Sequence, residues 1–349
     1  MGKNWALASA LAGVATLLVL VPSPEPVAES RGIQRVIAFG DSLMDCGTFG
    51  HIYATNPGRT YPQEIAEAYG IELGPNRQVE GYGHDGPADP DGLCYAEGGA
   101  VTGSFTEPGF DHNEAPLAFS QQIRNFEMQH GRFHQQDLVL VQIGGNDIIG
   151  PFYDKKLKAA LMADAPLPPD VREQIDARIR HAAMNEVKLL RYLLSLGAQR
   201  LVVLNNTDYG KAPYLEPWTP ELAERNHELV RLYNDTLQAN LPAVDRLLLV
   251  DAYRVMEEIY AHYGNYGFTH ADGDACLPGR EFCEPDSYVE PGADQAYIFG
   301  ARGHFASRTH SMLAQVVLER IAQTWPGSAV HSKPQLMTAA RATAEPIYH

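Results

Sequence analysis

Five short apolar runs recur along the chain, and segments long enough to form helices separate them. The runs, of which the second is the weakest, are residues 35–39, 93–96, 137–143, 200–204 and 246–250. Apolar runs of this length, rich in β-branched residues, are typical of strands that are buried on both faces of a parallel sheet. The spacing of the runs therefore predicts a parallel sheet of five strands.

Between these runs, apolar residues recur with the 3.6-residue period of an amphipathic helix. The clearest case is residues 171–196, where Gly197 provides the stop and one face collects Ile175, Ile179, Ala182, Val187, Leu190 and Leu194. Further helices are expected at residues 61–69, 117–130, 220–241 and 309–325. Strands that alternate with helices predict an α/β protein with three layers, α/β/α, whose functional residues lie at the carboxyl ends of the strands.

The first residues of the chain have the pattern of an export signal. Lys3 supplies a positive charge, residues 6–21 are uncharged and apolar, and three prolines precede Ala28, a small residue suited to cleavage. The apolar run is shorter than the ~20 residues that span a bilayer, although an uncleaved anchor is the alternative. We expect residues 1–28 to be a signal peptide, 29–325 one domain and 326–349 a mobile tail, in a secreted or periplasmic protein without stable membrane insertion.

Charge and cysteine content narrow the possible partners and the compartment. The formal net charge is −16, and so acidic a surface repels phosphate backbones, so no nucleic-acid partner is expected. Four cysteines in an exported chain favour disulfides over free thiols. Cys276 and Cys283 lie close together in one loop, which leaves Cys46 to pair with Cys94. The chain has no cluster with metal-ligand spacing and no glycine-rich nucleotide loop, so we predict no cofactor and no metal.

Four short motifs carry the residues that point to chemistry. They are Phe-Gly-Asp-Ser-Leu at residues 39–43, Tyr-Ala-Glu-Gly-Gly-Ala at 95–100, Gly-Gly-Asn-Asp at 144–147, and His304 with a second histidine, His310, six residues later. Singly, the first three would be ordinary turn or helix-cap sequences. Because Ser42, Gly99 and Asn146 each follow a predicted strand, all three are expected at one edge of the sheet. His310 is expected to be structural.

Together these motifs resemble the GDSL (SGNH) family of lipases and esterases, and the likeness extends over residues 35–325. The resemblance implies the flavodoxin-like SGNH-hydrolase fold, with Ser42 as the nucleophile and His304 as the general base. It also implies an oxyanion hole made of the Ser42 N–H, the Gly99 N–H and the side chain of Asn146. The substrate would then be a carboxylic ester or a lipid, bound through apolar contacts.

One catalytic element of that family is missing from the sequence. The position three residues before His304, where the family places the triad carboxylate, is Ala301. A backbone carbonyl near Ala301, a carboxylate from elsewhere such as Asp294, or an anion held near Arg302 could replace it, or the enzyme could be inactive. We expect a working Ser-His dyad assisted by a carbonyl or an anion.

The sequence thus predicts a secreted serine ester hydrolase, a lipase, phospholipase or esterase that forms an acyl-enzyme on Ser42. An acyltransferase is the nearest alternative, because it uses the same groups with an alcohol in place of water. A non-catalytic module that binds lipid or glycan is the alternative from another class, since a fold does not dictate a function.

Overall fold

The computed structural model describes residues 32–104, 114–161, 167–213, 219–280, 282–328 and residue 330. The chain divides into two compact units, Met1–Ser30 and Arg31–His349, and the described residues all belong to the second. The expected signal peptide and most of the expected tail lie outside these ranges. At the start of that tail, Pro326–Ser328 form a 3₁₀ turn (η4), and the Tyr69 hydroxyl donates to the Ser328 carbonyl at 2.8 Å.

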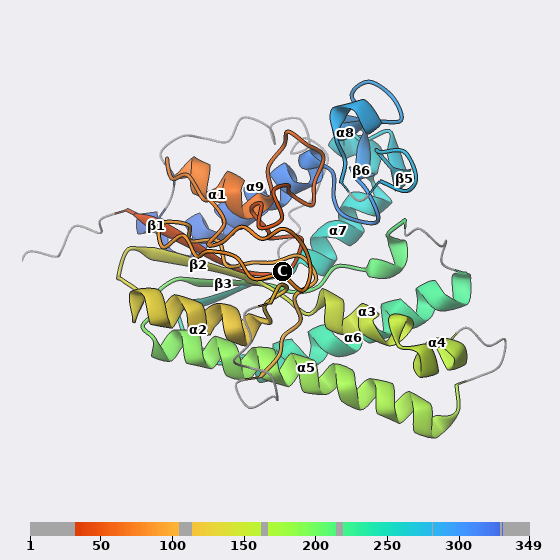
Figure 1. The fold of residues 1–349 in the computed structure, drawn as a ribbon, viewed down its shortest axis with the longest axis horizontal. Helices are drawn as coiled ribbons and strands as arrows, with labels where there is room; N and C mark the ends of the chain where they lie inside the picture. Colours follow the sequence, from red (N-terminus) through yellow and green to blue (C-terminus); the bar gives the residue numbers. More distant parts are fainter. Residues whose placement is uncertain are drawn as a thin grey trace, which may run out of the picture. The chain divides into compact units, whose positions relative to one another are not determined.

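Four parallel strands form the main sheet, in the order β1-β2-β3-β4 (Figure 1). Their bounds are β1 (Arg35–Gly40), β2 (Asp137–Gln142), β3 (Leu201–Leu204) and β4 (Leu247–Val250). β1 runs in register with β2 from Arg35 opposite Asp137 to Gly40 opposite Gln142. The α/β class and the parallel sheet are therefore as the sequence predicts.

The prediction of five strands is not confirmed, because residues 93–96 pair only at Cys94. Cys94 bridges Ala38 of β1 on one side and Pro75 on the other. Proline has no N–H to extend such pairing, and a turn begins at Gly98, two residues after the end of the segment. The segment nevertheless lies beside β1, on the side away from β2, because Tyr95 N–H donates to the Ala38 carbonyl at 2.7 Å. With it, the order is that of a flavodoxin-like sheet.

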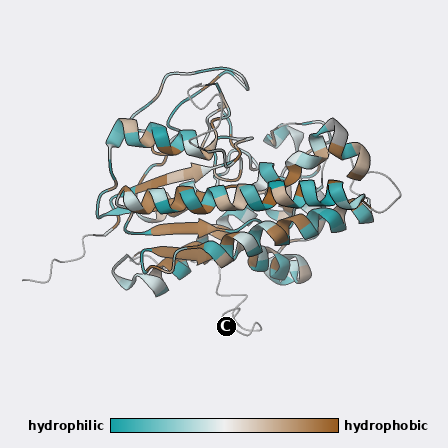
Figure 2. Ribbon diagram, turned by 90° about the horizontal axis from the view of Figure 1, so that it is seen from below, coloured by the Kyte–Doolittle hydropathy of each residue, from teal (hydrophilic) through white to brown (hydrophobic). Residues whose placement is uncertain are grey.

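Helices cover both faces of the sheet. Alternate strand residues such as Ile37, Val139 and Val203 pack into one apolar cluster with α2 (Phe119–His130), α5 (Pro169–Ser195) and α6 (Pro220–Asn240). Their neighbours, such as Val36, pack with α1 (Tyr61–Ala68), α7 (Ala252–Ala261) and α9 (Ser307–Thr324). Figure 2 shows brown, hydrophobic strands between helices that carry much teal, hydrophilic surface. The helices expected from apolar period are confirmed, with ends that differ by one or two residues.

The remaining elements surround the carboxyl edge of the sheet. Helices α3 (Gly145–Tyr153) and α4 (Lys155–Leu161) follow β2. Past α7, β5 (His270–Asp274) and β6 (Tyr297–Phe299) form a small parallel sheet of their own, with α8 (Ala293–Ala296) between them. Short 3₁₀ turns are η1 (Tyr209–Lys211), η2 (Tyr263–Tyr266) and η3 (Pro285–Ser287). In the described ranges, no helix is long and apolar enough to cross a membrane.

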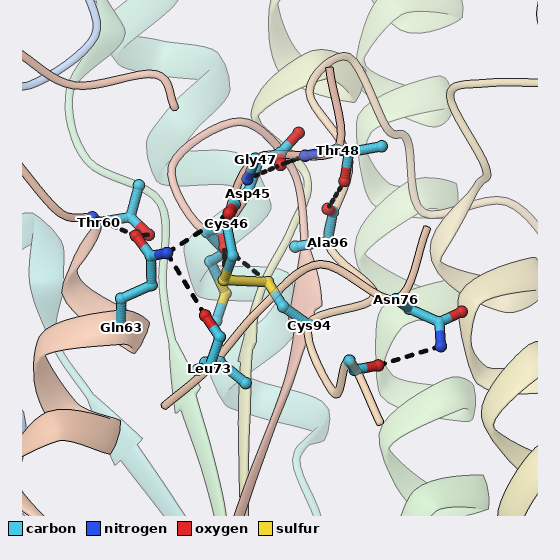
Figure 3. Close-up of a disulfide and its surroundings, with 12 residues drawn as sticks. Asp45, Cys46, Gly47, Thr48, Thr60, Gln63, Leu73, Asn76, Cys94 and Ala96 are labelled. Atoms are coloured by element: carbon cyan, nitrogen blue, oxygen red, sulfur yellow. Dashed lines mark hydrogen bonds between the residues drawn. A yellow bond between two sulfur atoms is a disulfide. The ribbon is translucent and has the colours of Figure 1, made fainter. Parts of the chain in front are cut away.

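Both expected disulfides are present. Cys46 and Cys94 have Cα atoms 6.2 Å apart, and Cys276 and Cys283 have Cα atoms 5.5 Å apart. The first bridge ties the loop after β1 to the segment beside β1. Figure 3 shows the Gln63 side chain next to it, donating to the carbonyls of Cys46 and Leu73 at 3.4 Å each. The loop that begins at the end of β1 is thus fixed covalently and by hydrogen bonds.

Removal of the two disulfides is expected to have unequal effects. The Cys46–Cys94 bridge spans 48 residues and the Cys276–Cys283 bridge spans 7. A longer closed loop loses more entropy, so the chain-entropy relation gives about 4 kcal/mol for the first bridge and about 2 kcal/mol for the second. Urea denaturation of the two paired Cys→Ser variants measures both losses. An equal loss, or a larger loss at Cys276–Cys283, would contradict this ranking.

Candidate active site

A cavity of about 220 Å³ opens at the carboxyl edge of the sheet, and the four residues singled out in the sequence all line it. Ser42 follows β1, Gly99 follows the segment beside β1, and Asn146 lies in the first turn of α3 after β2. His304 arrives from the loop between β6 and α9. Carboxyl ends of neighbouring parallel strands meet at one edge, and this explains why three motifs so far apart in sequence converge.

Ser42 and His304 are in direct contact. His304 Nε2 lies 2.8 Å from Ser42 Oγ, and His304 Nδ1 lies 3.2 Å from the carbonyl oxygen of Ala301. The ring of Tyr53 packs against the imidazole, with centroids 4.8 Å apart. A neutral imidazole with its proton on Nδ1 donates to the carbonyl and accepts at Nε2. Such a tautomer can take a proton from the serine.

Asp294, the carboxylate considered as a replacement acid, is engaged elsewhere. It lies on α8 and accepts a hydrogen bond from the neighbouring Gln295 side chain at 2.8 Å. Burial of the imidazole lowers the pKa of His304 to about 4, against a smaller raising effect of the Ala301 carbonyl, and the nearby charge of Arg302 lowers it further. The neutral form, which is the form that acts as a base, is therefore favoured over a wide pH range.

His310 lies apart from this chemistry, in the core. Its ring is buried on α9, and Nδ1 accepts the backbone N–H of Tyr61 at 3.2 Å. Burial lowers the pKa of His310 to about 3. His310 thus joins α9 to the start of α1, in agreement with the structural role expected for it.

Gly99 occupies a position that only glycine accommodates easily. Its φ is +87°, in the left-handed region that side chains disfavour. A Cβ there would lie 3.0 Å from the Tyr82 ring and 3.3 Å from Pro116. The absence of a side chain leaves the backbone of Gly99 open toward the cavity.

Asn146 is positioned by an equally constrained turn. Gly144 precedes α3 with a φ of +108°, and a Cβ there would lie 2.4 Å from the Tyr233 hydroxyl. The amide nitrogen of Asn146 donates to the Ala100 carbonyl at 2.8 Å. An amide NH₂ has two donors, so one hydrogen fixes the side chain and the other can serve a negative oxygen in the cavity.

Two carboxylates, Asp45, which is buried, and Asp147, which is half-buried, fix the loops that carry these groups. Asp45 accepts from the Gly98 N–H at 2.9 Å, and so connects the loop that carries Ser42 to the turn that carries Gly99. Asp147 accepts from the backbone N–H of Thr102 at 2.9 Å and from its hydroxyl at 3.1 Å. Burial raises the pKa of each carboxyl to about 6. Asp147 lies in the Gly-Gly-Asn-Asp motif, but the partners of both carboxylates lie on other loops and could not be identified from the sequence.

Aromatic side chains make up much of the remaining cavity wall. The tyrosines among them come from five separate segments: Tyr53, Tyr82, Tyr153, Tyr209 and Tyr260. No periodic pattern links these positions, so the sequence analysis did not find them. Within the described ranges, His, Cys, Asp and Glu side chains do not gather in threes that could hold a metal ion.

Comparisons with known proteins agree with this geometry. A sequence model of the GDSL-like lipase/acylhydrolase family matches residues 36–317. The GDSL esterase/lipase LTL1 of Arabidopsis thaliana is 25% identical, over 89% of this chain and 92% of that protein. The GDSL esterase/lipase EXL2 of the same plant is 23% identical, over 82% of this chain and 87% of that protein. The chain therefore belongs to the family of GDSL-like lipases and acylhydrolases, enzymes that cleave carboxylic esters.

Proposed function

We propose that this chain is a secreted serine hydrolase that cleaves acyl esters through an acyl-enzyme on Ser42. The observation that carries the proposal is the 2.8 Å contact between Ser42 Oγ and His304 Nε2 at the wall of the cavity. A nucleophile and a base within hydrogen-bond distance, with the base oriented by a third group, is the arrangement required for nucleophilic catalysis. The third group here is the Ala301 carbonyl, 3.2 Å from Nδ1.

In the proposed reaction, His304 Nε2 takes the proton of Ser42 as Oγ attacks the ester carbonyl. The tetrahedral intermediate places its negative oxygen among the N–H of Ser42, the N–H of Gly99 and the side chain of Asn146. As the intermediate collapses, the imidazolium gives its proton to the departing alcohol. Water then attacks the acyl-enzyme by the same steps and releases the acid. The acyltransferase alternative differs only in the acceptor of the acyl group.

The Ala301 carbonyl takes the place of the missing acid in this proposal. It can hold the imidazole in the tautomer that leaves Nε2 free to accept, but it carries no full charge to stabilise the imidazolium. An anion beside Arg302 stays a prediction, and chloride-dependent activity would test it. Loss of the acid from a complete triad can lower the rate ~10⁴-fold, so a slower enzyme than a full-triad relative is expected.

A fluorophosphonate probe tests the proposal directly. The probe should label the wild-type chain, and tryptic peptides should carry the adduct on Ser42. Incubation with a p-nitrophenyl ester and an added alcohol then separates hydrolysis from transfer, because a transferase yields the new ester as its main product. A chain that the probe does not label would favour the non-catalytic binding alternative.

Export is also part of the proposal. Two disulfides are compatible with an oxidising compartment. The segment that would direct export, residues 1–28, is outside the described ranges. Mass determination of the protein recovered from the medium or periplasm would show whether the chain is cut near Ala28.

The pH profile is expected to extend unusually far into the acid range. The pKa of His304 is lowered to about 4, so the neutral base is present above that pH and is lost as the pH falls through it. The pKa of His304 from an NMR titration, set beside the acid limb of kcat/KM, measures this. Ala301→Asp, which adds a negative charge beside the imidazole, should raise the pKa. A wild-type His304 that titrates near its ordinary value of 6.5 would refute the expectation.

A further inference from the structure

One peptide group lies between His304 and a carboxylate that belongs to no catalytic motif. The Ala301 carbonyl faces His304 Nδ1 at 3.2 Å, and it also accepts the backbone N–H of His304 at 3.0 Å. The N–H of the same peptide group, on Arg302, donates to Asp274 Oδ2 at 2.9 Å. Because a carbonyl and the following N–H form one planar unit, His304 and Asp274 are hydrogen-bonded to opposite ends of that unit.

We propose that Asp274 is a positioning residue that replaces the missing triad acid by acting on His304 through the peptide group between Ala301 and Arg302. The inference rests on the proposed function. The order of groups would be Ser42 Oγ, the His304 ring, the peptide C=O and N–H, and the Asp274 carboxylate. A side-chain acid at position 301 would be replaced by a main-chain amide with a carboxylate behind it.

The physical effect is polarisation of the amide. A negative charge that accepts from an N–H draws the proton toward itself and increases the negative charge on the carbonyl oxygen of the same unit. Hydrogen bonds linked in this way strengthen one another by roughly 10–30% per bond. The Ala301 oxygen becomes a better acceptor for His304 Nδ1–H, most of all when the ring is an imidazolium. The transition state, in which that cation forms, is stabilised more than the ground state.

The surrounding backbone holds this geometry in place. Asp274 ends β5, where it is in register with Phe299 of β6, the strand that leads into the histidine loop. Arg302 has a φ of +52° although it is not glycine, and such conformations persist only where the surroundings impose them. The Arg302 and Gly303 N–H groups both favour the ionised form of Asp274. Burial raises the pKa of Asp274 to about 6, so the group is ionised at neutral pH. The activity that persists between a pH of about 6 and the lower pKa of His304 is therefore expected at the reduced level of an enzyme without the Asp274 charge.

Sequence inspection could not find this residue. Asp274 stands 30 residues before His304, in a run of alternating small and acidic residues that reads as a turn. Only the pairing of β5 with β6 brings it to the loop. The simpler interpretation is that the carboxylate merely caps the turn, and the experiment must separate the two.

Asp274→Asn is the decisive variant, because an asparagine oxygen can still accept the Arg302 N–H while the charge is gone. The expected result at neutral pH is a kcat about 2–5-fold lower, which is what a 10–30% weakening of a hydrogen bond to a charged group gives, with KM nearly unchanged. The Nδ1–H proton resonance of His304 should move upfield, because its acceptor is weaker. Asp272→Asn is the matched control, since Asp272 is an exposed carboxylate on the same strand, and it should change neither quantity.

Two further measurements complete the test. Ala301→Asp in the Asp274→Asn background should restore part of the lost kcat, because a direct acid makes the relay unnecessary. An Asp274→Asn variant with wild-type kcat would overturn the inference. The inference would also be overturned if the loss of kcat in Asp274→Asn were explained by a lower melting temperature and the His304 Nδ1–H resonance did not move. Failure of the fluorophosphonate probe to label the wild type would instead overturn the proposed function, so the two failures are distinguishable.

Discussion

Ser42→Ala is expected to lower kcat for p-nitrophenyl ester hydrolysis by on the order of 10⁴–10⁶-fold. Serine hydrolases with complete triads lose about 10⁶-fold when the nucleophile or its histidine is removed. The loss here is expected nearer 10⁴-fold, because a site without a side-chain acid starts from a lower rate. Rates of p-nitrophenol release at saturating substrate give the measurement, and far-UV circular dichroism shows whether the fold is retained.

The same experiment includes a test of cooperation. Because Ser42 and His304 act in one step, the Ser42→Ala/His304→Ala double variant should be no slower than the single variants. Ser195→Ala is the matched control, since this serine is exposed at the end of α5 and does not line the cavity. Substantial hydrolysis by Ser42→Ala would remove Ser42 from the mechanism and, with it, the proposed function.

Asn146→Ala is expected to lower kcat by about 10²–10³-fold with little change in KM. A donor aimed at the oxyanion acts mainly in the transition state, and loss of one such donor has this effect in other serine hydrolases. The variant also loses the hydrogen bond to the Ala100 carbonyl, 2.8 Å long in the structure, so urea denaturation must accompany the kinetics. A net loss of about 1 kcal/mol in unfolding free energy is expected from that bond alone.

The control for this prediction is Asn265→Ala, because Asn265 is exposed in η2 and does not line the cavity. Asn146→Asp adds a sharper contrast, since a carboxylate keeps the shape of the side chain but repels a developing oxyanion. It should be at least as slow as Asn146→Ala. A rise in KM with unchanged kcat for either variant would assign Asn146 to ground-state binding instead.

Regular elements with strong apolar patterns were predictable from the sequence. β2 is buried at every position, and its four central residues, 138–141, form a continuous apolar run. α5 and α6 are long enough for their period to be plain, and α6 also has a capping residue, Thr219, whose hydroxyl accepts the Leu222 N–H at 3.3 Å. The small β5–β6 sheet was not predicted, because β5 is largely polar and none of its residues is buried. Its pairing depends on tertiary contacts with β6, and local sequence does not encode these.

The residues of the candidate site also fall into those that the sequence predicts and those that only the structure reveals. Ser42, Gly99, Asn146 and His304 could be named because each lies in a motif that resembles a family pattern. The groups that hold them could not, because their partners are set by the folded chain: Asp45 meets Gly98 across 53 positions. Asp274 has no motif at all. The sequence identified the groups proposed to react, and the structure was needed to identify those that orient them.

Because the main chain supplies the hydrogen-bond acceptor for His304, the site is expected to tolerate an unusual set of substitutions. Substitution at position 301 cannot delete the carbonyl that faces His304. A change of side chain there therefore leaves the hydrogen-bond acceptor in place. Ala301 is 6% exposed, and this packing, not the catalytic chemistry, should exclude side chains larger than aspartate. Position 302 is more sensitive. Proline there would remove the N–H that binds Asp274 and could not adopt a φ of +52°. A saturation library should therefore retain small residues at position 301, aspartate among them, and reject proline at position 302.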